Sequence, residues 1–174
     1  MPDQSHPTLE HTLSFRVRSY ELDQNGHVNN AIYVAWAENV TNEHAEAIGF
    51  GRAWSLEHGG GWVVRRHEAT YHLPAVARDE IEATVRVEGV RGVRGWRRTW
   101  IRRASDGALL AEVFSEWAWV RTADGRPARV PAEIVAAFGA HQAEGWPSSV
   151  EDTLQGQQIA LPLQSTRVAT QPTA

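Results

Sequence analysis

The sequence predicts an α+β fold in which one long helix packs against a single, mostly antiparallel sheet. Two observations predict it. A run with helical spacing, residues 33–48, follows an early strand-like segment, and four further strand-like runs joined by short turns come after it. This order is typical of an α+β layer arrangement. The 174 residues suit one domain that is long enough to bury a sizeable core.

The first two elements are the strand and the long helix. Leu13, Phe15 and Val17 alternate with polar residues, which predicts a strand over about residues 12–22. The helix that follows has apolar residues at i, i+3, i+4 and i+7, and its opposite face is polar. Asn29 or Asn30 can cap its start, and a glycine at position 49 is placed to end it.

The rest of the chain predicts four strands and a short helix. Alternating or apolar runs predict strands over about residues 62–72, 80–90, 93–103 and 109–121. The last of these runs is apolar on both faces, which indicates a central strand of the sheet. A helix that begins at Pro131 is expected to reach about residue 143. We therefore expect a domain over residues 10–146, with polar tails at 1–9 and 147–174.

Composition narrows the class of protein. A formal net charge of −4 and a pI near 6.1 argue against nucleic acid as the main partner, because a phosphate-binding surface is usually strongly basic. No apolar run approaches the ~20 residues needed to span a bilayer, and the N-terminus lacks the features of a signal peptide. We therefore expect a cytoplasmic protein with no membrane span. The absence of Cys excludes thiolate chemistry, and the absence of Lys excludes a Schiff-base lysine.

Two patterns that suggest zinc sites fail on spacing or composition. His67 and Glu68 with His72 resemble the HExxH helix of zinc proteases, but the second histidine is one residue too far and the segment is strand-like. His44 and Glu46 resemble the H-x-E of zinc deaminases, which also need a pair of Cys ligands that this chain lacks. We therefore expect no metal site.

Polar residues crowd the start of the long helix. Asp23, Asn25 and His27 precede it within a few positions. One interpretation is a polar turn with a capping Asn, since Asp, Asn and Gly are ordinary turn residues. The other is a catalytic site for acyl transfer. The free N–H groups of a helix start can stabilise an oxyanion, a carboxylate can attack a carbonyl or activate water, and His can assist proton transfer.

The pattern of residues 23–38, DQNGHVNNAIYVAWAE, resembles the signature of the hotdog-fold acyl thioesterases. It is similar both to the 4-hydroxybenzoyl-CoA thioesterases (D-x-x-G-x-V and an aromatic helix) and to the plant acyl-ACP thioesterases (D-x-N-x-H-V-N-N-x-x-Y). Residues 68–81, 107–120 and 126–131 resemble later segments of the family in the same order, so the likeness covers about residues 12–139. It implies a single hotdog domain, an antiparallel sheet wrapped around one long central helix, plus a short C-terminal helix.

The resemblance also implies the residues of the catalytic site. Asp23 falls on the catalytic carboxylate of the benzoyl-CoA group and would be general base or nucleophile. Asn25 and His27 fall on the Asn and His of the plant catalytic set, although the benzoyl-CoA group usually has an apolar residue where His27 stands. Glu68 falls near a further plant-type carboxylate, across a difference in loop length. The backbone N–H of Asn30, or of a neighbour, would polarise the thioester carbonyl.

The substrate implied is an acyl-CoA or an acyl-carrier protein, so that CoA or phosphopantetheine is part of the substrate and no separate cofactor is expected. Tyr33 belongs to the helical stripe that either packs in the core or lines an acyl tunnel. Arg94, Arg97 and Arg98 belong to a basic run that either pairs with Glu on the sheet surface or binds the phosphates of CoA or an acidic carrier.

The resemblance implies an oligomer as well. The plant enzymes hold two hotdog units in one chain, whereas this chain has one. The expectation is therefore at least a homodimer, or a dimer of dimers, with the site between subunits. The aromatic content independently suggests that another copy covers part of the second face of the sheet. The alternatives to a thioesterase are a hotdog acyl-CoA dehydratase or hydratase, and a non-catalytic acyl-CoA-binding subunit.

Overall fold

The sheet of the computed structural model, which describes residues 8–139, has five antiparallel strands in the order β1-β3-β4-β5-β2. Their bounds are β1 (Glu10–Arg16), β2 (Gly60–Tyr71), β3 (Glu80–Arg91), β4 (Arg94–Arg103) and β5 (Leu109–Arg121). Short turns join β3 to β4 and β4 to β5, whereas β1 and β2 take the two edges. The predicted α+β class, with one sheet and few helices, is confirmed.

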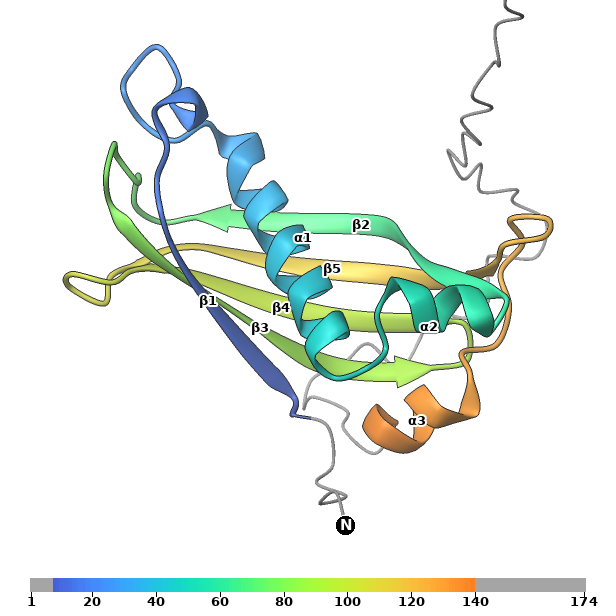
Figure 1. Ribbon diagram of the computed structural model, residues 1–174. Helices are drawn as coiled ribbons and strands as arrows, with labels where there is room; N and C mark the ends of the chain where they lie inside the picture. The colour runs from blue at the N-terminus through green and yellow to red at the C-terminus, as the bar shows by residue number, and fades with distance from the viewer. Residues whose placement is uncertain (1–7, 140–174) are drawn as a thin grey trace, which may run out of the picture.

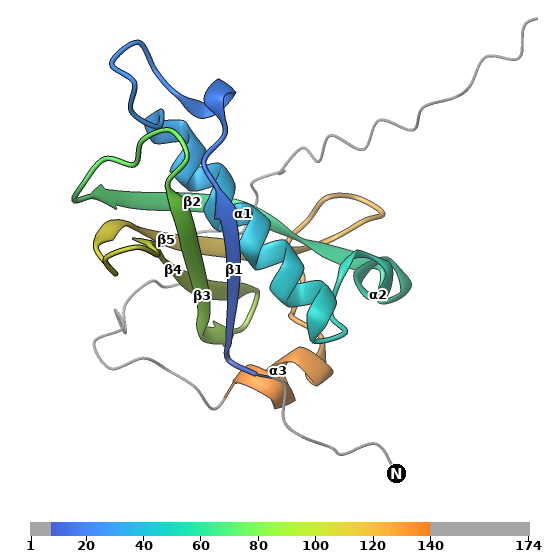
Figure 2. The same ribbon diagram turned by 60° about the vertical axis from the view of Figure 1, so that its left-hand side comes forward.

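The long helix α1 (Asn30–Ala47) lies across one face of the sheet (Figures 1 and 2). Its 18 residues span about 27 Å at a rise of about 1.5 Å per residue. The buried stripe matches the predicted helical spacing and consists of Tyr33, Trp36, Ala37, Val40, Thr41 and His44. The stripe faces the sheet because only that side of the helix is apolar enough to leave water.

Of the two predicted capping residues, Asn29 and Asn30, the structure shows that Asn29 caps α1. Its Oδ1 accepts the N–H of Ala31 at 3.0 Å and so satisfies one of the donors that a helix start leaves free.

Replacing Asn29 by Ala is expected to lower the free energy of unfolding by about 1 kcal/mol, because the capped N–H loses its acceptor. Asn29→Asp is the matched control, since its carboxylate keeps an acceptor at the same position and suits the helix dipole. Urea unfolding of the three proteins measures the difference. Equal destabilisation by both substitutions would contradict the capping role.

The core has two parts, which lie along α1. The first fills the space between α1 and the strands, and Ile81, Val85 and Ile101 are fully buried there. The second lies towards the C-terminal end of α1, beneath the short helices α2 (Arg52–Glu57) and α3 (Ala132–Phe138). Figures 1 and 2 place α3 at the opposite end of the molecule from the loop that precedes α1. The two ends of α1 are therefore in different surroundings.

Three features differ from the sequence prediction. The first strand ends at Arg16 instead of near residue 22, because the Glu21 carboxylate accepts the Arg18 N–H at 2.7 Å and the backbone turns into a 3-10 helix over Ser19–Glu21. The helix α2 lies in a segment for which no helix is predicted. The strand that is apolar on both faces, β5, is an interior strand as expected, but the middle strand is β4.

Some predicted boundaries lie outside the described residues. The C-terminal helix is present as α3, and the residues 140–143 predicted to continue it are outside the range 8–139. The expected domain end at residue 146, the tail 147–174 and residues 1–7 of the N-terminal tail also lie outside it.

Candidate active site

The polar residues of the motif lie in a loop, residues 22–29, between the 3-10 helix and the start of α1 (Figure 1, upper left). A short antiparallel bridge closes this loop on itself. The connection between β2 and β3 lies against it, since the Val28 N–H donates to the Ala75 carbonyl at 2.9 Å and His27 pairs with Val76. Backbone bonds therefore hold the loop at the N-terminal end of α1.

Asp23 holds the loop with one carboxylate oxygen and leaves the other unbonded. Its Oδ1 accepts the N–H of Asn25 at 2.8 Å and the N–H of His27 at 3.1 Å. No group within residues 8–139 bonds its Oδ2, and the side chain is partly exposed. A carboxylate that backbone donors position, with one oxygen free, is placed to take a proton from water or to attack a carbonyl.

The start of α1 supplies a free hydrogen-bond donor. The N–H of Ala31 and the N–H of Ile32 both bond to Asn29, at 3.0 Å and 2.9 Å. In the described part of the chain, the N–H of Asn30 has no acceptor. It is a donor at the positive end of the helix dipole. The exposed side chains of Asn25 and His27 likewise make no hydrogen bond within residues 8–139.

Glu21 supports the loop and was not among the residues that the sequence singled out. It is only 4% exposed, and its carboxylate accepts the Arg18 N–H at 2.7 Å and the Trp36 Nε1–H at 3.1 Å. Its carbonyl accepts the Asn29 N–H at 2.9 Å. Glu21 thus joins both ends of the loop to α1. The available signal was its place on the apolar side of the predicted strand, in line with Val17.

For Tyr33 the sequence left two alternatives, core packing and lining of an acyl tunnel. In the single chain Tyr33 packs in the core. Its side chain is 2% exposed, and its hydroxyl accepts the Ala75 N–H at 2.8 Å. Burial raises the pKa of the hydroxyl. The ring lies edge-on to Trp36 and Tyr71, with centroids 5.2 Å and 5.5 Å away. Tyr33 therefore fixes the β2–β3 connection against the helix.

Replacing Tyr33 by Phe is expected to destabilise the fold by about 1–3 kcal/mol, because the Ala75 N–H would then be buried without an acceptor. Tyr20→Phe is the control, since Tyr20 is 75% exposed. Urea unfolding tests the pair. If Tyr33→Phe and Tyr20→Phe unfold at the same urea concentration, the hydrogen bond between Tyr33 and the Ala75 N–H does not contribute to the stability of the fold.

Glu68 faces away from α1 and is not brought together with Asp23 in one chain. The preceding residue, His67, faces the helix, since its Nε2 lies 3.2 Å from Glu38 Oε1. Successive strand residues point to opposite faces, so Glu68 lies on the outer face of β2. There it is exposed and pairs with Arg66. A catalytic role for Glu68 stays a prediction.

His67 belongs to a second polar cluster that the sequence did not indicate as a unit. Its Nδ1 lies 2.9 Å from Ser115 Oγ, and its Nε2 faces Glu38. Ser115, His67 and Glu38 are connected in the same sequence as the Ser, His and acid of a catalytic triad. Ser115 is only 3% exposed, however, so a substrate does not reach it in the single chain. The cluster ties α1 to β2 and β5. No local pattern connects these residues, because each comes from a different element.

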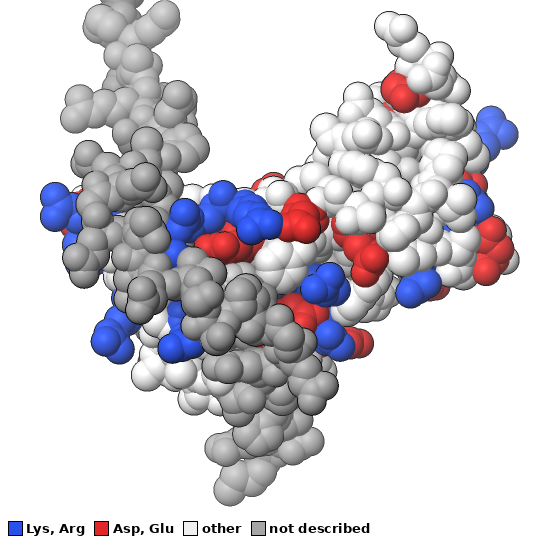
Figure 3. Space-filling view, turned by 180° about the vertical axis from the view of Figure 1, so that it is seen from behind, with Lys and Arg blue, Asp and Glu red and all other residues white. Residues whose placement is uncertain are grey.

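The arginine run of β4 divides between the two faces of the sheet. Arg94 and Arg98 lie on the face away from α1, and Figure 3 shows basic and acidic side chains next to one another there. Arg94 pairs with Glu116 at 3.2 Å and Arg98 with Glu88 at 3.5 Å. Arg97 lies on the other face, against α1. The three arginines therefore form no single cluster in one chain, and phosphate binding by any of them stays a prediction.

Apolar side chains are exposed around the loop. Tyr20, Tyr71, Leu73 and Val76 are 75%, 42%, 48% and 40% exposed. They come from the 3-10 helix, the end of β2 and the β2–β3 connection, all of which adjoin the loop. The outer edge of β2 has no strand partner within residues 8–139. Exposed apolar groups gathered in this way are typical of a binding surface.

Two other kinds of feature are absent from the described part of the chain. No helix within residues 8–139 is long and apolar enough to cross a membrane. The same residues contain no group of three or more His, Cys, Asp or Glu side chains arranged to hold a metal ion.

Comparisons with known proteins identify the family of the chain. A family model described as the thioesterase-like superfamily matches residues 17–138. The chloroplastic acyl-acyl carrier protein thioesterase ATL2 of Arabidopsis thaliana is 26% identical over 134 residues, which cover 77% of this chain and 71% of that protein.

Two solved structures share the fold at low sequence identity. A candidate oleoyl thioesterase from Lactobacillus plantarum has a TM-score of 0.71 and 22% identity, over 82% of this chain and 56% of that one. A 1,4-dihydroxy-2-naphthoyl-CoA thioesterase from Synechocystis has a TM-score of 0.67 and 14% identity, over 74% of this chain and 94% of that one. The chain thus spans little more than half of the Lactobacillus protein. The family model covers well over half of this chain, so the chain belongs to the thioesterase-like superfamily and has the hotdog fold, as the sequence resemblance implies.

Proposed function

We propose that the chain hydrolyses an acyl thioester at the loop of residues 22–29. Membership of the thioesterase-like superfamily supports thioester hydrolysis as the general reaction. The observation that carries the assignment to this loop is the state of Asp23. Two backbone N–H groups hold one of its oxygens. Within residues 8–139, the other oxygen and the N–H of Asn30 at the start of α1 have no hydrogen-bond partner.

In the proposed reaction, Asp23 is a general base or a nucleophile. As a base, its free Oδ2 takes a proton from water, and the water oxygen attacks the thioester carbonyl carbon. The Asn30 N–H bonds the carbonyl oxygen as it gains negative charge. The carbon–sulfur bond then breaks, and the proton that Asp23 took from water passes through His27 to the leaving thiolate, which yields a free acid and a thiol and restores the Asp23 carboxylate. Asn25 positions the carbonyl or the water.

A second copy of the chain is part of the proposal. The loop is exposed, and four apolar side chains around it are open to solvent. The free edge of β2 ends beside this region. A partner seated there would exclude water from the thioester and supply the second wall of the site, which is the homodimer that the resemblance implies. Glu68, on the outer face of β2, contributes to such a site only across this interface.

The substrate class is tested by release of free thiol. The panel includes acyl-CoAs of different chain length and acyl-carrier proteins, because the Arabidopsis relative is named for the latter and the Synechocystis structure for a CoA thioester. We expect turnover of at least one member. No thiol release from any substrate would refute hydrolysis. Conversion of enoyl-CoA or 3-hydroxyacyl-CoA without thiol release would instead favour a dehydratase or hydratase. Binding of an acyl-CoA without any turnover would favour the non-catalytic acyl-CoA-binding subunit.

A further inference from the structure

We propose that the hollow at the C-terminal end of α1 binds a carboxylic acid with an apolar body, at a site separate from the loop. Two adjoining cavities form it, a larger groove of about 440 Å³ and a smaller pocket of about 60 Å³. They share the lining residues Asn42, Ala45, Phe50, Trp62 and Trp117. The helix rises about 17 Å between Asn30 and Thr41, so this hollow lies well away from the loop.

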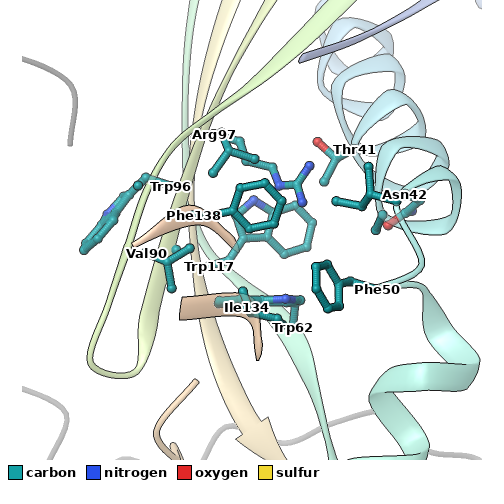
Figure 4. Close-up of a pocket in the computed structure, with 15 residues that line it drawn as sticks. Thr41, Asn42, Phe50, Trp62, Val90, Trp96, Arg97, Trp117, Ile134 and Phe138 are labelled. Carbon is teal, nitrogen blue, oxygen red and sulfur yellow. The ribbon is translucent and has the colours of Figure 1, made fainter. Parts of the chain in front are cut away.

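The walls of the smaller pocket are mostly aromatic or aliphatic. Figure 4 shows Phe50, Trp62, Val90, Ile134 and Phe138 around it. They come from the α1–α2 connection, β2, β3 and α3, so the pocket exists only in the folded domain. Apolar walls with a few converging polar groups are the usual make-up of a small-molecule site. These walls fit the hydrocarbon body of the ligand.

Arg97 brings a positive charge into this apolar pocket without an acidic partner. Among the described residues, no Asp or Glu lines this pocket, whereas Glu46 lines the adjoining groove. No carboxylate within residues 8–139 pairs with the guanidinium. Its Nη1 donates instead to His44 Nδ1 at 2.8 Å, while His44 Nε2 donates to the Thr8 carbonyl at 2.8 Å. In this tautomer His44 is neutral, so it orients the guanidinium and leaves the charge uncompensated. Arg97 is partly buried, and a partly buried charge without a counterion suits an anionic ligand.

Trp117 supplies a second unused donor to the same pocket. Its Nε1–H is buried and has no acceptor among the described residues. Arg97 pairs in register with Ser115, two positions before Trp117 on the adjacent strand β5, so the two donors lie on neighbouring strands. An orphaned buried donor is rare in native proteins and calls for an acceptor. The two oxygens of a carboxylate match the guanidinium and the indole N–H, and Thr41 and Asn42 line the same pocket from α1.

The test measures binding of octanoate and of octan-1-ol, which has the same chain and no charge, by isothermal titration calorimetry. We expect octanoate to bind the full chain at least about 10-fold more tightly than octanol, as a charge-assisted hydrogen bond implies. Arg97→Gln should weaken octanoate binding about 10-fold and leave octanol unchanged. Trp117→Phe, which removes only the donor from an aromatic wall, should weaken octanoate about 5-fold.

Arg102→Gln is the matched control. Arg102 is an exposed arginine of the same strand that donates to the Gly107 carbonyl, outside the pocket. It should bind octanoate as the unaltered chain does. Absence of octanoate binding, equal affinity for octanoate and octanol, or normal binding by Arg97→Gln would overturn the proposal. If circular dichroism shows that Arg97→Gln does not fold, Trp117→Phe and the octanol comparison decide. The assay needs no turnover, so its outcome is independent of the proposed hydrolysis.

Discussion

Asp23→Asn is expected to lower the rate of thiol release by about 10²-fold or more, with little change in stability. The amide of Asn cannot take a proton from water or act as a nucleophile, and general base catalysis is worth about that factor. The amide oxygen can still accept the N–H groups that Oδ1 holds now, those of Asn25 and His27. The loop should therefore keep its conformation. Steady-state kinetics on the best substrate of the panel measure the effect.

A matched control for this substitution exists elsewhere in the chain. Asp106 also accepts a backbone N–H two residues ahead, that of Ala108 at 3.0 Å, and lies in an exposed turn. Asp106→Asn should leave thiol release unchanged. If Asp23→Asn and the unaltered chain release thiol at equal rates, Asp23 has no catalytic role, while hydrolysis itself would stand.

Between pH 7 and pH 5 the stability is expected to fall by about 2 kcal/mol through His44 alone. Burial, together with the charge of Arg97, lowers the pKa of His44 from 6.5 to about 4. The ring is fully buried between Arg97 and the Thr8 carbonyl, and His11 stacks on it at 5.8 Å. The unfolded chain therefore binds a proton at a higher pH than the folded chain does. The contribution is complete above about pH 6.5 and is lost as the pH falls towards 4.

The measurement is urea unfolding at pH 7, 6 and 5, compared with His44→Gln. Gln keeps an acceptor for Arg97 and a donor for Thr8 but does not titrate, so its stability should change less with pH. The difference between the two slopes isolates His44 from the other histidines and the carboxylates. Parallel slopes would mean that His44 takes up its proton equally in the folded and unfolded chains.

Local patterns accounted for the elements and for the candidate loop. The helical spacing of α1, the alternation in the strands and the turn residues before Asn29 all act over a few neighbouring residues, so one sequence is enough to read them. The prediction of the first strand was wrong at its end for a local and a non-local reason, because the Glu21 carboxylate accepts the Arg18 N–H three residues back as well as a donor from α1. Glu21 continues the alternation, but Trp36 of α1 donates to its carboxylate, and that partner is 15 residues away.

The outcome for β4 has a similar cause. The arginine run was expected either to pair with Glu on the sheet surface or to bind phosphates, and it lies on the middle strand β4. Pairing with β3 and β5 places its arginines against acidic side chains on one face and against His44 on the other. Two-residue alternation separates Arg97 from Arg94 and Arg98, but it does not say which face meets the helix.

The sequence by itself determined the class of fold, the long helix with its Asn cap and the loop that carries Asp23, Asn25 and His27. These depend on short-range periodicity and on turn chemistry. Only the tertiary structure decided that Asn30 keeps a free N–H, that Glu21 rather than Glu68 lies at the loop, and that Arg97 and Trp117 meet in one pocket. The pocket depends on the register of strands and on contacts between segments far apart in the chain, and the place of Glu21 depends on its bond to Trp36, neither of which a local pattern specifies.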